Sequence, residues 1–172
     1  MGDEASGPLC TRTPNCTSET WTSHRFSRAV IDAYHYGLNI LSQQHTGASY
    51  DLFGFSGGGA IATIVAAERK DVNSLRTVAG NLDHRAVNAY HRVSPLTGSL
   101  NPIDITFRLT DMPQIHFIGA KDEIVPSWIS KAFIDALGET TCARMIKVTG
   151  NGHTTGWVDF WKANTKVQPR CR

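Results

Sequence analysis

The 172-residue sequence lacks several features that would place it in a large class of proteins. No stretch approaches the roughly 18 consecutive apolar residues of a membrane-spanning helix. The opening residues MGDEASGPLC are acidic and polar, unlike the start of a signal peptide. The basic residues form no run, and the formal net charge is only +2, so nucleic acid is not an expected partner. These absences leave a globular chain with a single core.

Metal-binding motifs are also missing. No CxxC pair occurs, and the spacing of the histidines gives no zinc pattern, so we expect neither a metal nor another cofactor. The four cysteines fit two local disulfides, Cys10–Cys16 and Cys142–Cys171, which would indicate a periplasmic or secreted origin. Four unpaired thiols in a cytosolic protein are the alternative, so the sequence leaves the localisation open.

Apolar runs alternate with segments of helical periodicity. The runs predict strands at 50–55, 75–80, 114–119 and 144–150, and the periodicity predicts helices at 27–45, 59–70, 127–138 and 155–163. Because the strands lack polar/apolar alternation, we expect an α/β fold whose mostly parallel sheet is buried under helices on both faces. Residues 1–24 are expected to be an N-terminal coil segment, and residues 25–172 one domain with an excursion at about 81–113.

Residues 54–58, GFSGG, lie between a predicted strand and a predicted helix and match G-x-S-x-G. In a nucleophile elbow, glycines two residues before and after the serine give clearance for a sharp strand-to-helix turn. The turn would present the Ser56 hydroxyl at a helix N-terminus, where the Gly57 N–H is an oxyanion donor. A tight connection or a phosphate-binding loop is the alternative, but the G-x-G-x-x-G spacing is absent.

Two later strand ends carry an aspartate and a histidine. Asp122 follows the third predicted strand, with Glu123 and Asp83 as competing carboxylates, and a turn former or helix cap is the ordinary role of such a residue. His153 follows the last strand, between glycines. The chain order Ser56, Asp122, His153 is that of hydrolases with a nucleophile elbow.

Together the segments GFSGGGAIA, GAKDEIVP and GNGH resemble the α/β-hydrolase superfamily, over about residues 20 to 165. The stretch TVAGNLDH further resembles a bacterial, mostly uncharacterised and often exported subgroup. The resemblance implies an esterase- or lipase-like serine hydrolase that cleaves a carboxylic ester or related acyl bond through an acyl-enzyme. It implies Ser56 as nucleophile, His153 as general base and Asp122 as the acid. A catalytically weak or inactive module that binds an acyl ligand or a protein partner is the alternative.

The sequence departs from this family in its N-terminal part. Family members usually carry several strands before the elbow, whereas 55 residues precede Ser56 here, and no HGGG-like stretch supplies a second oxyanion N–H. We therefore expect an N-terminally shortened α/β-hydrolase that lacks the first strands of the full fold. The strand before the elbow would then have an open edge, and pairing of this edge with a second copy of the chain could give a homo-oligomer. Five apolar residues of the excursion either line an acyl pocket or pack on the sheet: Leu82, Tyr90, Val93, Leu96 and Leu100.

Overall fold

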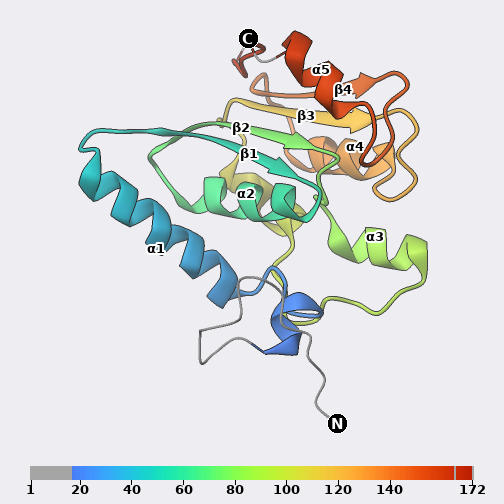
Figure 1. The fold of residues 1–172 in the computed structure, drawn as a ribbon, viewed down its shortest axis with the longest axis horizontal. Helices are drawn as coiled ribbons and strands as arrows, with labels where there is room; N and C mark the ends of the chain where they lie inside the picture. Colours follow the sequence, from blue (N-terminus) through green and yellow to red (C-terminus); the bar gives the residue numbers. More distant parts are fainter. Residues whose placement is uncertain (1–16, 165, 172) are drawn as a thin grey trace.

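The computed structural model describes residues 17–164 and 166–171, and its centre is a four-stranded parallel sheet (Figure 1). The strands are β1 (Tyr50–Phe55), β2 (Val72–Val78), β3 (Gln114–Gly119) and β4 (Ala143–Val148), and they lie side by side in chain order. The pairs β1–β2, β2–β3 and β3–β4 are all parallel. The C-terminal ends of all four strands therefore lie at the same edge of the sheet, where α/β proteins bind their ligands.

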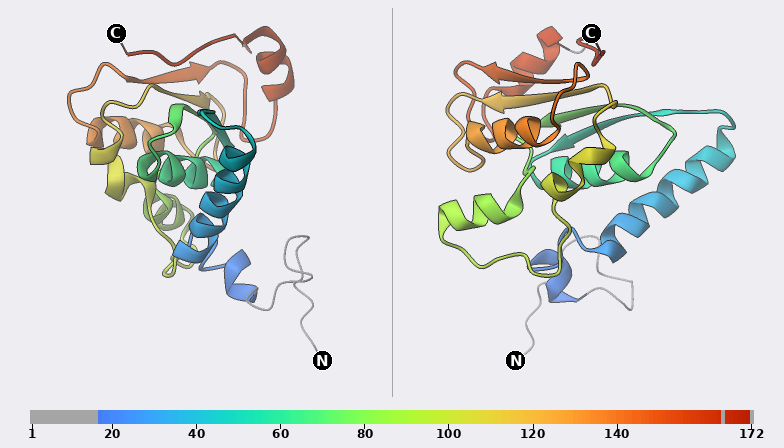
Figure 2. Two further views of the ribbon diagram at one scale, coloured as in Figure 1. Left: turned by 90° about the vertical axis from the view of Figure 1, so that its left-hand side faces the viewer. Right: turned by 180° about the vertical axis from the view of Figure 1, so that it is seen from behind.

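Helices cover both faces of this sheet, as the sequence predicts. They are α1 (Arg28–Gln44), α2 (Gly57–Glu68), α3 (His84–His91), α4 (Ser127–Ala136) and α5 (Trp157–Asn164), with the 3₁₀ helices η1 (Ser18–Trp21) and η2 (Pro102–Arg108). The views in Figure 2 show α2 and α4 on one face and α5 on the other. Helix α1 packs mainly against α2, where Ile31 meets Ile64 and Val65 in a buried apolar cluster.

The core has one layer on each side of the sheet. Between the strands and the α2–α4 face lie side chains such as Leu75, Ile129 and Phe133, all fully buried. On the α5 face, Phe117 and Trp157 belong to a second cluster. Strand β3 is buried along its whole length because it has a strand on each side and helices on both faces.

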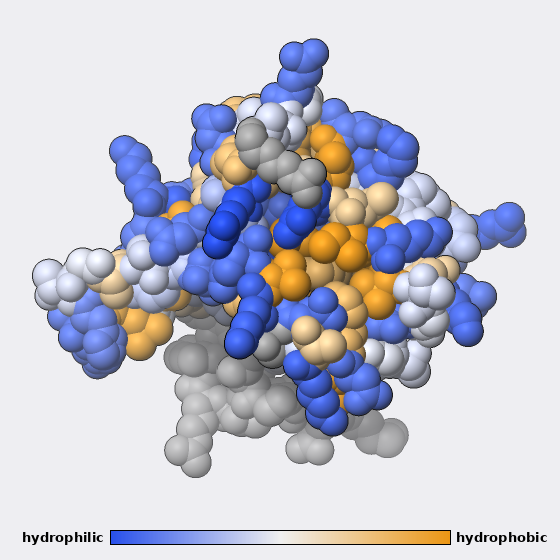
Figure 3. Space-filling view, turned by 90° about the horizontal axis from the view of Figure 1, so that it is seen from above, coloured by the Kyte–Doolittle hydropathy of each residue, from blue (hydrophilic) through white to orange (hydrophobic). Residues whose placement is uncertain are grey.

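Strand β1 differs from the expectation of burial on both faces, which is wrong for this strand. It is an edge strand of the described sheet, and its side chains alternate between more and less exposed positions. Phe53 and Phe55 are 56% and 45% exposed. Strand β1 is thus apolar in composition, although the other described residues leave about half of Phe53 and Phe55 exposed. Seen from the α5 side, hydrophobic surface lies among hydrophilic side chains (Figure 3).

The other elements fall close to their predicted bounds, and the excursion at 81–113 contains structure that the sequence did not reveal. It includes α3 and η2. Leu82 is fully buried in the core, whereas Tyr90, Val93 and Leu100 are exposed. Ser18–Trp21 form η1 inside the segment expected to be coil, and the domain bounds themselves stay a prediction.

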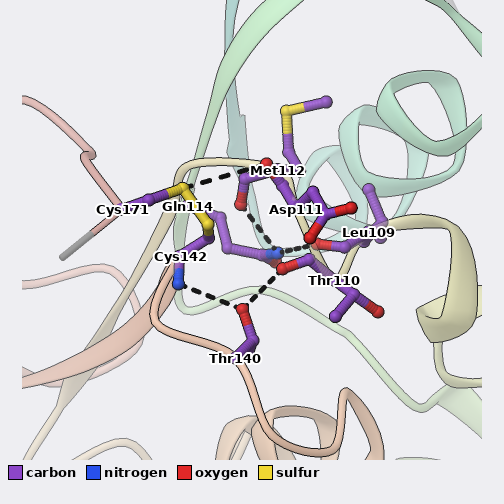
Figure 4. The surroundings of a disulfide bond; sticks show 8 residues. All are labelled: Leu109, Thr110, Asp111, Met112, Gln114, Thr140, Cys142 and Cys171. Carbon is purple, nitrogen blue, oxygen red and sulfur yellow. Dashed lines mark hydrogen bonds between the residues drawn. A yellow bond between two sulfur atoms is a disulfide. The ribbon is translucent and has the colours of Figure 1, made fainter.

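A disulfide joins Cys142, just before β4, to Cys171 in the C-terminal segment (Figure 4). This is one of the two pairs expected from the sequence, and Cys10 and Cys16 lie outside the described residues. The C-terminal segment packs over the buried side chain of Arg76, whose Nε donates to the carbonyl of Val167 at 3.2 Å. The disulfide therefore fastens the C-terminal segment to the sheet, at the end opposite the carboxyl ends of the strands. None of the described helices is both long enough and apolar enough to cross a membrane.

Candidate active site

Ser56 stands at the sharp turn between β1 and α2. It is the N-cap of α2 and has φ 50° and ψ −120°, a conformation with positive φ that non-glycine residues rarely adopt. The Ser56 N–H donates to Val78 O at 2.9 Å, and the Asn81 N–H donates to Ser56 O at 3.0 Å. Both backbone groups of the serine are thus held by the end of β2 and the residues after it, which compensates for the local strain.

Two glycines make this turn possible because they let backbone segments approach more closely than a side chain would allow. A Cβ atom on Gly54 would collide with the carbonyl oxygen of Gly58, and one on Gly59 would lie 2.9 Å from the Cα of Gly80. A Cβ on Gly58 would meet no atom within 4 Å. The prediction that glycines two before and two after Ser56 both provide clearance is therefore wrong for Gly58. The close approach falls one residue later, at Gly59, because α2 packs there against the chain that follows β2.

The structure brings Ser56, His153 and Asp122 together at the carboxyl edge of the sheet. The Ser56 Oγ lies 3.0 Å from His153 Nε2. His153 Nδ1 lies 3.0 Å from Asp122 Oδ2 and 3.2 Å from Oδ1. An ionised carboxylate only accepts hydrogen bonds, so the imidazole carries its proton on Nδ1 and leaves Nε2 free to accept from the serine hydroxyl.

The Asp122 carboxylate is fixed by its own loop. Its side chain is fully buried, and Oδ1 accepts hydrogen bonds from the N–H groups of Ile124 at 2.9 Å and Val125 at 2.8 Å. These two bonds orient the carboxylate and leave Oδ2 directed at the histidine. The charged group is therefore paired and hydrogen-bonded, as a buried carboxylate must be.

The two competing carboxylates, Asp83 and Glu123, lie elsewhere and are not hydrogen-bonded to His153. Asp83 caps α3, where its Oδ1 accepts from the N–H groups of Arg85 at 3.1 Å and Ala86 at 3.2 Å. The same oxygen accepts from Asn101 Nδ2 at 2.7 Å. Glu123 is exposed. Of the three candidates, only Asp122 is hydrogen-bonded to His153.

Gly57, the expected oxyanion donor, is the first residue of α2. The first N–H groups of a helix have no acceptor within the helix, and the helix dipole favours negative charge beside them. The ring of Phe26 packs against this glycine, 3.3 Å from the position a Cβ would take. The first turn of α2 thus presents N–H donors beside the Ser56 hydroxyl.

Sequence reasoning missed three aromatic residues at this site. Phe26 packs on Gly57, the Phe55 ring centroid lies 5.2 Å from that of His153, and the Trp157 indole N–H donates to the His153 carbonyl at 2.8 Å. Phe55 directly precedes the serine, so its position beside the elbow was a usable signal. Phe26 is distant in sequence, and nothing in its surroundings signals the contact.

No group of three or more His, Cys, Asp or Glu side chains within the described ranges is arranged to hold a metal ion. The chemistry available to this arrangement is that of a hydroxyl next to a base, with a carboxylate behind the base and helix N–H donors beside the hydroxyl. Such groups support nucleophilic attack on a carbonyl carbon.

The family model described as Serine hydrolase (FSH1) matches residues 9–155, most of the chain. No curated protein matches the chain in sequence.

Solved structures of similar fold include an esterase from Pyrococcus furiosus, with a TM-score of 0.67 at 15% identity. An α/β serine hydrolase homologue from Coxiella burnetii gives 0.58 at 19%, and a puromycin hydrolase gives 0.62 at 17%. The matches cover 81%, 86% and 76% of this chain. The chain spans 60%, 57% and 22% of the length of those three proteins, in the same order. At these identities the likeness concerns the fold, which is that of α/β-hydrolases.

Proposed function

The chain belongs to the Serine hydrolase (FSH1) family, and we propose that it cleaves a carboxylic ester or a related acyl bond through an acyl-enzyme at Ser56. The observation that carries this proposal is the continuous line of hydrogen bonds from Ser56 through His153 to Asp122. The similarity of the fold to an esterase supports the same chemistry. Export, which the TVAGNLDH stretch suggested, stays a prediction.

In the proposed reaction His153 Nε2 takes the proton of the Ser56 hydroxyl as the oxygen attacks the carbonyl carbon. Asp122 stabilises the imidazolium that forms, because its buried carboxylate faces Nδ1. The tetrahedral intermediate then collapses, and His153 gives its proton to the departing alcohol. Water, activated by His153, releases the acid from Ser56 and restores the free hydroxyl.

The negative charge of the intermediate is stabilised by the Gly57 N–H at the start of α2. One oxyanion donor is typically worth about 3 kcal/mol of transition-state stabilisation, roughly a hundredfold in rate. A site that relies on a single assigned donor is best tested with an activated ester, whose leaving group departs readily. p-Nitrophenyl butyrate is such a substrate.

The decisive experiment compares wild type with Ser56→Ala on p-nitrophenyl butyrate and on a fluorophosphonate probe, which labels only an activated serine. We expect the wild type to turn over the ester and to carry the probe on Ser56, and the variant to do neither. Equal rates for the two proteins, or an unlabelled wild type, would contradict the proposal. The second result would favour a binding module.

The two aspartates at strand ends provide a matched control. Asp122→Asn removes the carboxylate behind His153, so kcat is expected to fall on the order of 10³–10⁴-fold. Asp83→Asn makes the same chemical change at the N-cap of α3. It is expected to leave kcat within about twofold of the wild-type value, because a helix cap affects stability and not this chemistry. A large loss in kcat for Asp83→Asn would contradict the assignment of Asp122.

A further inference from the structure

The loop that carries His153 is rich in glycine, and within it the Gly152 N–H donates to Thr155 Oγ1 at 3.3 Å. Gly150, Gly152 and Gly156 surround the histidine, and Gly150 and Gly156 have φ of +86° and +85°. A backbone rich in glycine is entropically costly to fix in one conformation. The 3.0 Å contact between His153 and Ser56 therefore requires restraints from outside the loop.

One restraint comes from β3. A Cβ on Gly119 would lie 2.5 Å from the carbonyl oxygen of Asn151. Position 119 must therefore be glycine for the loop to pack on the end of the strand. The Lys121 N–H donates to the same carbonyl at 2.9 Å. These contacts fix the start of the loop, two residues before the histidine, but not His153 itself.

The imidazole of His153 is held by Asp122, and its backbone carbonyl is held by Trp157, the first residue of α5. Its indole Nε1–H lies 2.8 Å from the carbonyl oxygen of His153 and 3.1 Å from that of Gly152, so the single donor is shared between two consecutive carbonyls. Trp157 is buried, with 7% of the residue exposed, and it packs in the cluster that includes Val78 and Phe117.

We propose that Trp157 is a positioning residue for the reaction, because its indole N–H ties the backbone of His153 to the buried face of the sheet. The inference rests on the proposed function. Within the described residues the indole N–H is hydrogen-bonded to Gly152 and His153 and not to Ser56 or Asp122, so in this role it acts through the histidine. A displacement of a reacting group by about 1 Å lowers the rate by about 100-fold. Loss of the hydrogen bond from the indole to the His153 carbonyl should therefore lower kcat and leave KM nearly unchanged.

The test replaces Trp157 by Phe, which keeps an aromatic ring in the cluster and removes the N–H. The matched control is Trp161→Phe, on the same helix. Trp161 packs on Phe53 and Phe117, and its indole N–H has no hydrogen-bond partner within residues 17–164 and 166–171. We expect kcat for p-nitrophenyl butyrate to fall about 10–100-fold in Trp157→Phe and less than about twofold in Trp161→Phe. Equal losses in the two variants would overturn the inference.

A second readout separates positioning from general destabilisation. In a His153→Ala background, Trp157→Phe is expected to change the residual rate less than about twofold, because residues that act as a unit are not additive. An equal loss with and without His153 would show that Trp157 does not act through it. If Trp157→Phe does not fold, site-specific incorporation of benzothienylalanine at position 157 keeps the shape of the indole and removes only the N–H, with the same expectations.

The inference also has a readout that needs no turnover. The His153 Nδ1 proton, hydrogen-bonded to Asp122, should give a downfield proton resonance in NMR spectra of the wild type. We expect Trp157→Phe to lose or broaden it and Trp161→Phe to keep it. If wild type shows no turnover that depends on Ser56, the proposed function fails, and this resonance still decides the role of Trp157: an unchanged signal in Trp157→Phe would overturn it.

Discussion

His116 lies fully buried in the middle of β3, and we expect it to make the stability of the fold depend on pH. Gln114 Nε2 donates to the carbonyls of Leu109 at 2.8 Å and Met112 at 3.1 Å, so the Gln114 Oε1 faces the imidazole. His116 Nε2 therefore carries the proton and donates to this oxygen at 3.0 Å, while Nδ1 accepts from Thr77 Oγ1 at 2.7 Å. The neutral ring is fully satisfied, and burial lowers the pKa of His116 to about 3.

The sign of the effect follows from the two pKa values. In the unfolded chain a histidine titrates near pH 6.5, so between about pH 6.5 and 3 the unfolded state binds a proton that the folded state does not. The contribution of His116 to stability is thus fully present above about pH 6.5 and is lost as the pH falls toward 3. From about pH 7.5 to pH 5, the free energy of unfolding should fall by about 2 kcal/mol through this residue alone.

Urea unfolding of wild type, His116→Asn and Thr77→Val between about pH 7.5 and 5 measures this loss. His116→Asn should be less stable at the upper pH and lose about 2 kcal/mol less than wild type on acidification. Thr77→Val should lose about 1–3 kcal/mol at every pH and keep the wild-type dependence, because the imidazole stays buried. The pKa of His84 is also lowered by burial, but this residue is common to all three proteins and cancels in the differences. If His116→Asn is as sensitive to acid as wild type, His116 does not carry this pH dependence.

Two further predictions concern the disulfide and the elbow glycines. Cys171→Ala opens a link between residues 29 apart, so the free energy of unfolding measured in urea should fall by about 3–4 kcal/mol, while kcat at low denaturant should stay within about twofold because the link lies at the far end of the strands. A loss of less than about 1 kcal/mol, or no difference between oxidised and reduced wild type, would contradict this estimate. Gly54→Ala should abolish fluorophosphonate labelling, since its Cβ collides with the carbonyl of Gly58, whereas Gly58→Ala should be labelled like wild type because its Cβ meets open space. Equal labelling of these two variants would contradict the different roles of Gly54 and Gly58 in the turn.

The order of strands and helices was predictable because each signal is local. The bounds of β1 and β3 agree with the apolar runs 50–55 and 114–119, and the parallel sheet agrees with their lack of alternation. The exposure of Phe53 was not predictable in this way, because an apolar strand gives no information about which face its neighbours cover. Helix α3 was missed for a different reason: its eight residues, HRAVNAYH, contain a single large aliphatic side chain, Val87, and lie in a segment rich in Asn, His, Pro and Thr that is typical of a loop.

The residues of the candidate site were predictable to the extent that they sit in motifs. Ser56 has an identifying pattern in its own neighbourhood, and Asp122 and His153 were chosen by chain order and by their places after strands. Trp157 has no such signal. Its indole reaches the His153 carbonyl only because α5 starts four residues later and turns its first side chain back toward the sheet. A contact of this kind depends on the direction of a helix in space, which the sequence pattern does not give.

The choice between Asp83 and Asp122 shows where local reasoning stops. Both residues follow a strand, and in both one carboxylate oxygen accepts hydrogen bonds from two backbone N–H groups two and three residues later. Asp122 therefore caps its loop and also pairs with His153, so the role of turn former does not exclude a role in the chemistry. The difference lies in the second oxygen, and it is decided by a separate segment. Because the loop of His153 packs against the end of β3 through Gly119, the imidazole arrives beside Asp122, in the loop that follows that strand. Capping holds the carboxylate still, and the packing of a distant loop gives it a partner.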